Sequence, residues 1–89
     1  MGLQFFANDR YEILILLKEN QVKIKDEQYV PLSQQEIADM AHFSKLKTNK
    51  ILNELIDMEY VKPYQNKRGK YAITEKSYKL IELFKNTDI

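Results

Sequence analysis

Residues 32–58 read LSQQEIADMAHFSKLKTNKILNELIDM, and this stretch decides the fold. Ser33 and Glu36 have the S-x-x-E spacing of a capping box, in which the serine hydroxyl and the glutamate carboxylate satisfy backbone amides at a helix start. A helix is therefore predicted to begin near Gln34. Its apolar positions form a short stripe that we expect to be buried: Ile37, Ala38, Met40 and Ala41.

A second helix follows the segment 41–44, which breaks the apolar period. Ser44 is suited to cap this helix, which we expect to end near Met58. Apolar spacing by three and four predicts its buried face: Thr48, Ile51, Leu52, Leu55 and Met58. The opposite face carries cations, amides and one leucine: Lys45, Leu46, Asn49, Lys50 and Asn53. Two short helices joined in this way form a helix-turn-helix.

A helix with a broad apolar surface and a short two-stranded ribbon precede this motif. Alternation of apolar and charged residues predicts the ribbon, and Pro31 keeps its second strand at a sheet edge. The expected elements are a helix from Asn8 or Asp9 to about Glu19, a strand over 22–25, a turn over 26–28 and a strand over 29–32.

A β-hairpin with a basic tip follows the helix-turn-helix. Segments 60–65 and 70–74 are strand-like, and the turn between them contains Gly69, which can adopt positive φ. Thr74 is suited to cap a last helix over about 75–86. The apolar residues of that helix cover more than one face, which is more than a single core contact requires.

The order of these elements resembles the winged helix-turn-helix DNA-binding domains of bacterial regulators. Residues 32–40 resemble the start of the helix-turn-helix of the cyclic-AMP receptor protein type, and residues 43–55 are similar to that family's recognition helix. Residues 71–77, YAITEKS, resemble the Y-x-L-T-x-K-G that closes the wing in MarR-type and PadR-type repressors. His42 stands where the turn commonly has glycine, and Ser77 stands where the wing motif has glycine.

This resemblance implies one α+β domain over residues 1–89, mostly helical, with a small antiparallel β-hairpin as the wing. The helix-turn-helix would occupy about 33–58, the wing about 60–74 and the C-terminal helix about 75–86. A length of 89 residues without internal repeats also predicts a single domain.

Charge is distributed unevenly along the chain. Residues 45–70 contain seven cations and three carboxylates, a net charge of +4, although the whole chain carries only +1. A basic segment beside an acidic remainder is typical of a protein with one face on a polyanion. We therefore expect double-stranded DNA as the partner, and a solvated surface without function is the alternative.

Two groups of residues are the predicted DNA contacts. The recognition helix would supply Ser44, Lys45, Leu46, Lys47, Asn49, Lys50 and Asn53, and the wing would supply Lys67, Arg68 and Lys70. In the major groove, either asparagine can pair with adenine, and the lysines can reach guanine or phosphate. Leu46 suits a thymine methyl group or, alternatively, packing against the preceding helix. The wing cations would neutralise the DNA backbone or enter the minor groove.

Enzymatic and metal chemistry are disfavoured by composition. The chain has no cysteine and one histidine, and His42 with Asp39 makes an incomplete metal site. No nucleophile, base and orienting group can be placed together, so neither a cofactor nor catalysis is expected. The absence of cysteine and of an apolar membrane segment or leader predicts a cytoplasmic protein without membrane contact.

The predicted function is sequence-specific binding of an operator by a homodimeric transcriptional repressor. One module covers too little DNA for selectivity in a genome, which favours two half-sites and two subunits. The expected dimer interface is apolar: Leu3, Phe5, Phe6, Tyr78, Ile81 and Phe84. Ordinary core packing of these residues is the alternative.

Two other functions remain open at this stage. The same fold can serve as a protein-interaction module, and the small net charge of +1 keeps this reading open. DNA binding can also serve replication or recombination in a plasmid or phage. No cluster of residues points to a particular small-molecule effector.

Overall fold

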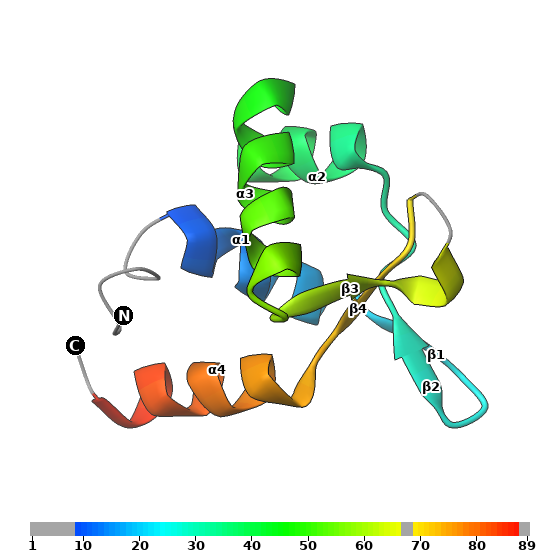
Figure 1. Ribbon diagram of the computed structural model, residues 1–89, viewed down its shortest axis with the longest axis vertical. Coiled ribbons are helices and arrows are strands. Elements are labelled where there is room, and N and C mark those ends of the chain that lie inside the picture. The colour runs from blue at the N-terminus through cyan, green and yellow to red at the C-terminus, as the bar shows by residue number, and fades with distance from the viewer. Residues whose placement is uncertain (1–8, 67–68, 88–89) are drawn as a thin grey trace.

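The structure, a computed structural model, describes residues 9–66 and 69–87 (Figure 1). In this part the chain forms four helices and two small antiparallel sheets, which is the α+β class that the sequence predicts. The elements are α1 (Asp9–Glu19), β1 (Val22–Ile24), β2 (Glu27–Tyr29), α2 (Gln34–Ala41), α3 (Lys45–Asp57), β3 (Val61–Pro63), the 3-10 turn η2 (Tyr64–Asn66), β4 (Tyr71–Ile73) and α4 (Glu75–Thr87).

Both sheets are two-stranded hairpins, and backbone hydrogen bonds link one to the other. Val22 pairs with Tyr29 in the first hairpin, which turns at residues 25–26 instead of the predicted 26–28 because Lys25 adopts a φ of 57°. The second hairpin, β3 with β4, is the wing. Val30 and Tyr71 exchange two backbone hydrogen bonds of 2.7 and 3.1 Å, so the segment leading into α2 is tied to the wing.

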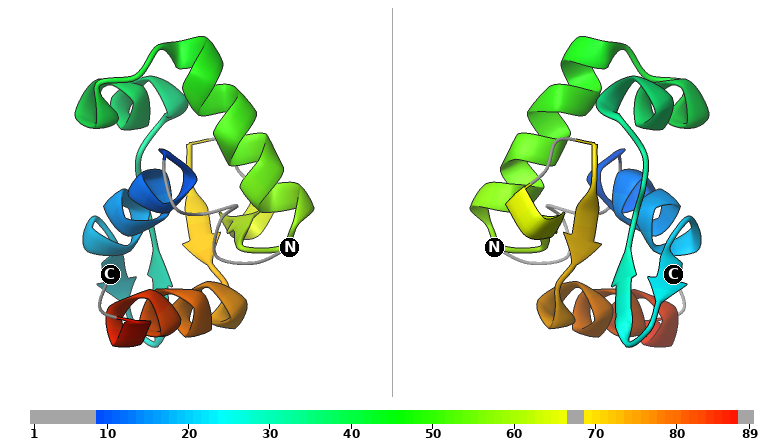
Figure 2. Two further views of the ribbon diagram at one scale, coloured as in Figure 1. Left: turned by 90° about the vertical axis from the view of Figure 1, so that its left-hand side faces the viewer. Right: turned by 90° about the vertical axis from the view of Figure 1, so that its right-hand side faces the viewer.

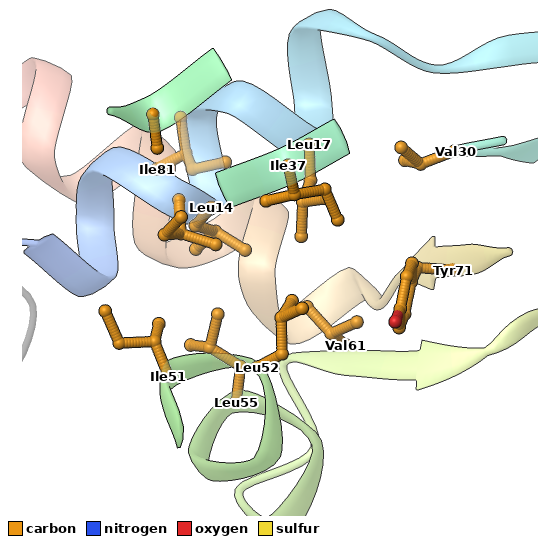
Figure 3. Close-up of a cluster of buried hydrophobic side chains, with 12 residues drawn as sticks. Leu14, Leu17, Val30, Ile37, Ile51, Leu52, Leu55, Val61, Tyr71 and Ile81 are labelled. Carbon is orange, nitrogen blue, oxygen red and sulfur yellow. The ribbon is translucent and has the colours of Figure 1, made fainter. Parts of the chain in front are cut away.

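The core lies where α1, α2 and α3 meet the base of the wing (Figure 3). Leu14 and Leu17 of α1 and Leu52 and Leu55 of α3 are fully buried. The predicted buried face of α3 is confirmed for its first four positions, Thr48, Ile51, Leu52 and Leu55. At the end of that face Met58 is only half-buried. Figure 2 shows α4 at the end of the molecule away from the turn between α2 and α3.

Two burial predictions made from the sequence are wrong. Met40 is 44% exposed, because Ile37, Ala38 and Ala41 already form the side of this eight-residue helix that faces the core. Ile81, predicted at a subunit interface, is 2% exposed and belongs to the core of its own chain. For Ile81, ordinary core packing is the correct alternative.

The turn between α2 and α3 is built from local hydrogen bonds. The capping box is confirmed, because the Glu36 amide donates to Ser33 Oγ at 3.1 Å and the Ser33 amide donates to Glu36 Oε1 at 2.9 Å. His42 ends α2 with a φ of 60°, while the Phe43 amide donates to the Ala38 carbonyl at 3.0 Å. The left-handed residue and the hydrogen bond from the next amide back to Ala38 together form a Schellman motif. In this motif the left-handed residue that closes the helix is usually glycine.

Replacement of His42 by glycine is expected to stabilise the protein, because a side chain in the left-handed region costs about 1 kcal/mol or more. The His42→Gly variant should have a free energy of unfolding about 1 kcal/mol higher in urea titrations. Asp39→Gly is the matched control inside α2, where glycine lowers stability by about 0.5–1 kcal/mol. Equal effects of the two glycines would contradict this reading of the turn.

Candidate nucleic-acid interface

The face of α3 opposite the core is open to solvent. The buried positions fix the rotation of the helix, and successive residues turn by about 100°, so Leu46, Lys50 and Asn53 point outward. Leu46 is 81% exposed, which rules out its predicted alternative of packing against α2. Leu46 thus adds one apolar side chain to an outward face that otherwise carries cations and amides.

Lys47, a predicted DNA contact, is turned to the flank of α3 that meets α1. Its Nζ lies 2.5 Å from Asp9 Oδ2 and 4.2 Å from the centre of the Phe43 ring. On the same flank, Arg10 donates two 3.1 Å hydrogen bonds to the Glu54 carboxylate. These contacts hold α1 against α3 and place Lys47 beside them, away from the outward face.

Ser44 caps α3 as predicted, since the Lys47 amide donates to its Oγ at 3.1 Å. Lys45 and Lys50 are exposed, at the start and the middle of the helix. Both can therefore reach phosphates that approach α3 without breaking a contact within the core.

Three side-chain amides form a chain between α2 and α3. Asn49 Nδ2 donates to Gln34 Oε1 at 2.9 Å, and Asn53 Nδ2 donates to Asn49 Oδ1 at 3.0 Å. Gln34 is the first residue of α2, and Asn49 is half-buried against it. The sequence placed both asparagines on the outward face but gave no indication of their link to Gln34.

The wing lies beside the start of α2. Gly69 adopts the predicted positive φ, 74°, and its backbone approaches the Cα of Ser33. Two predicted wing contacts, Lys67 and Arg68, lie outside the described residues. Lys70 is half-buried, with its Nζ 5.3 Å from the centre of the Tyr29 ring. Figure 1 shows the described base of the wing on the side of the molecule where α2 begins.

An aromatic pair joins the wing to the first hairpin. The rings of Tyr29 and Tyr64 stack with their centres 4.6 Å apart and 12° between their planes. The Tyr64 hydroxyl donates to Glu27 at 2.9 Å, and this bond raises the pKa of Tyr64. The pair therefore braces the wing against β2.

The segment that closes the wing is a clamp on the end of α3. The hydroxyls of Thr74 and Ser77 both donate to the Tyr60 carbonyl, and Thr74 also donates to the Glu59 carbonyl at 2.7 Å. Lys76 donates to the Met58 carbonyl at 2.9 Å. Thr74 was predicted to cap α4 through its side chain, but its hydroxyl is used across the wing; its backbone carbonyl accepts from α4 instead.

The remaining residues of the predicted dimer interface are either outside the described part or engaged within the chain. Leu3, Phe5 and Phe6 lie outside the described residues. The Tyr78 hydroxyl bonds the Gln21 side chain at 2.8 and 3.0 Å, and the Phe84 ring lies 4.3 Å from the Tyr11 ring. Beside this aromatic pair is an open, mostly apolar groove of about 630 Å³ between α1, α4 and the end of α2, lined in part by Tyr11, Ile15, Leu16, Met40 and Phe84.

The described part of the chain contains neither a candidate metal site nor a helix suited to cross a membrane. Residues 9–66 and 69–87 hold no group of three histidines or carboxylates placed to bind a metal ion. No helix among the same residues has the length and apolarity needed to cross a membrane.

Comparison with known protein families and with curated proteins gives no match. Solved structures do match. The reduced, Fe(II), CO-sensing protein from R. rubrum has a TM-score of 0.70 and 22% identity over 91% of this chain. Oxidized CprK in complex with o-chlorophenolacetic acid has a TM-score of 0.55 and 20% identity over 98% of this chain. Reduced CprK without ligand has a TM-score of 0.55 and 17% identity over 83%.

These matches define the fold. The described residues have the same α+β fold as the matched part of these structures, which agrees with the fold class that the sequence predicts. This chain spans slightly under two fifths of the CO-sensing protein and of these CprK chains, covering 38%, 37% and 38% of their lengths. The resemblance of residues 71–77 to MarR-type and PadR-type wings stays a prediction.

Two Thr→Val substitutions should show whether Thr74 stabilises the fold through the hydrogen bond of its hydroxyl or only through burial of its side chain. Thr74→Val removes the one hydroxyl proton that is shared between the Glu59 and Tyr60 carbonyls, and it should lower the free energy of unfolding by about 0.5–1.5 kcal/mol. Thr48 is fully buried, and its hydroxyl has no hydrogen-bond partner within the described residues. Thr48→Val should therefore leave stability unchanged or raise it by up to about 1 kcal/mol. Similar losses in both variants, measured by urea unfolding, would contradict the clamp.

Proposed function

We propose that this protein binds double-stranded DNA in a sequence-specific way and regulates transcription. The observation that carries the proposal is the outward face of α3, with Leu46 81% exposed, in a fold matching cyclic-AMP receptor protein DNA-binding domains. Further support comes from neighbours of the same fold, one a CO-sensing protein and another solved with o-chlorophenolacetic acid. Sensing of this kind accords with regulation, although this chain spans only part of each neighbour.

The chemistry of the face suits the major groove, which is wide enough to admit an α-helix. Leu46 would contact a thymine methyl group, while Lys45 and Lys50 would neutralise phosphates on either side. Lys70, with Lys67 and Arg68 as predicted from the sequence, would extend the phosphate contacts along the wing. Ser44 acts as a helix cap, and Lys47 is left out of the proposed contact set because its side chain lies on the flank of α3 that meets α1.

A homodimer that represses by occupying its operator is the finer form of the proposal. A single module buries about 600–1,000 Å² on DNA, which is too little to select one site in a genome. Two subunits on a two-fold symmetric site provide the missing selectivity. Of the predicted dimer residues, Leu3, Phe5 and Phe6 stay candidates from the sequence, and Tyr78 and Phe84 could contribute only the surface that their contacts within the chain leave open.

A protein-interaction module is the second candidate, and the apolar groove between α1 and α4 favours it. In that case the partner would cover the side of α1 formed by Tyr11, Ile15 and Leu16, and α3 would have no role in recognition. A DNA-binding factor in replication or recombination would use the same face of α3, so it differs from a regulator only in the location of its sites.

The test is selection from a random duplex DNA pool by the purified protein, followed by sequencing, at two salt concentrations. We expect enrichment of a two-fold symmetric site with half-sites about ten base pairs apart. A single, unpaired site would refute the homodimer and leave DNA recognition intact. No retention even at low salt would refute DNA binding and favour the protein-interaction module.

Salt dependence provides a quantitative prediction with an internal control. Each phosphate contact contributes about −0.9 to the slope of log affinity against log salt. Lys45→Ala and Lys50→Ala should each reduce the magnitude of that slope by about 0.9 per subunit, or about 1.8 for a homodimer, as measured by fluorescence anisotropy on the selected duplex. Lys47→Ala is the control, because its side chain lies on the flank of α3 that meets α1, and it should leave the slope unchanged. An equal reduction in all three variants would contradict the assignment of the outward face.

A further inference from the structure

The amide chain from α2 to α3 distinguishes between the two asparagines of the recognition helix. Asn49 uses its Nδ2 to bond Gln34 and its Oδ1 to accept from Asn53, so both ends of its amide are engaged. Asn53 uses only one N–H, toward Asn49, and its side chain is exposed. An asparagine amide has two N–H donors and a carbonyl with two lone pairs. Asn53 therefore keeps one donor and its whole acceptor for a ligand.

Gln34 is the acceptor at one end of this chain. Gln34 Oε1 faces Asn49 and accepts its 2.9 Å hydrogen bond, and Asn49 Oδ1 accepts from Asn53 at 3.0 Å. Both asparagine amides therefore donate in the direction of Gln34, and the free carbonyl and N–H lie at the Asn53 end.

One donor and one acceptor on the same amide match adenine in the major groove. Adenine presents N7 as an acceptor and its N6 amino group as a donor, and asparagine pairs with both. Leu46 lies seven residues before Asn53, almost two full turns, so the two side chains share a face about 10 Å apart along the helix.

We propose that Asn53 reads an adenine in each half-site, on the same face of α3 as Leu46, and that Gln34 is a positioning residue that orients Asn53 through Asn49. This inference rests on the proposed DNA-binding function. It assigns Gln34 a role in base preference although its side chain is bonded to the protein instead of the DNA.

The experiment repeats the duplex selection with Asn53→Ala, Gln34→Ala and Gln35→Ala beside the unaltered protein. Asn53→Ala should lower the preference for adenine at one position of each half-site by about 5- to 150-fold, the range expected for a bidentate base contact. Gln34→Ala should lower the preference at that same position by a smaller factor and leave the salt slope unchanged. Gln35→Ala is the matched control, because Gln35 is exposed on the same turn and bonds Asp39.

The double variant Gln34→Ala/Asn53→Ala tests the coupling between the two residues. If Gln34 acts through Asn53, the double variant shows no loss at that position beyond that of Asn53→Ala alone. A uniform loss for all sequences in Gln34→Ala would overturn the positioning role and indicate a phosphate contact.

An unchanged base preference in Asn53→Ala would overturn the reading of adenine by Asn53 while the selected site still supports the proposed function. Failure of the unaltered protein to select any site would overturn the proposed function, and the inference with it. The unfolding midpoint of each variant identifies a loss of fold, which is not expected for Asn53 because its side chain is exposed.

Discussion

Burial of one face of α3 against α1 is the constraint on which the rest of the structure depends. Leu52 and Leu55 are fully buried beside Leu14 and Leu17 (Figure 3), and each such side chain contributes about 1.5–3 kcal/mol. An exposed ion pair such as Lys47 with Asp9 contributes about 0–1 kcal/mol. The apolar contact therefore fixes the rotation of α3, and the ion pair forms between side chains that this rotation brings together. A shift of one residue would turn the helix by about 100° and bury a different face.

Local chemistry made much of this fold predictable from the sequence. The capping box at Ser33, the cap at Ser44 and the three-and-four spacing of α3 depend on residues within one or two turns, and the structure confirms them. Predictions of burial failed where the burial of a side chain depends on parts of the chain that are distant in sequence. Periodicity suggested that Met40 is buried, but it stays 44% exposed at the edge of the open groove between α1 and α4, because the other three apolar positions of this eight-residue helix face the core.

The site was less predictable because its geometry comes from long-range hydrogen bonds. Thr74 looked like a helix cap, yet its hydroxyl reaches the carbonyls of Glu59 and Tyr60, fifteen and fourteen residues earlier. The link from Asn49 to Gln34 likewise crosses fifteen residues. Strands of three residues cannot hold a wing by themselves, so these clamps, with the Val30–Tyr71 bonds, determine where the wing lies relative to α2 and α3.

A net charge of only +1 is compatible with binding to a polyanion because of how far the charges act. The Debye length at physiological salt is about 8 Å, whereas the molecule measures 33 × 32 × 21 Å. Carboxylates on the far side of the domain are therefore screened from DNA at the outward face of α3. Lys45 and Lys50, the exposed lysines nearest that face, therefore count for more there than the net charge of the whole chain.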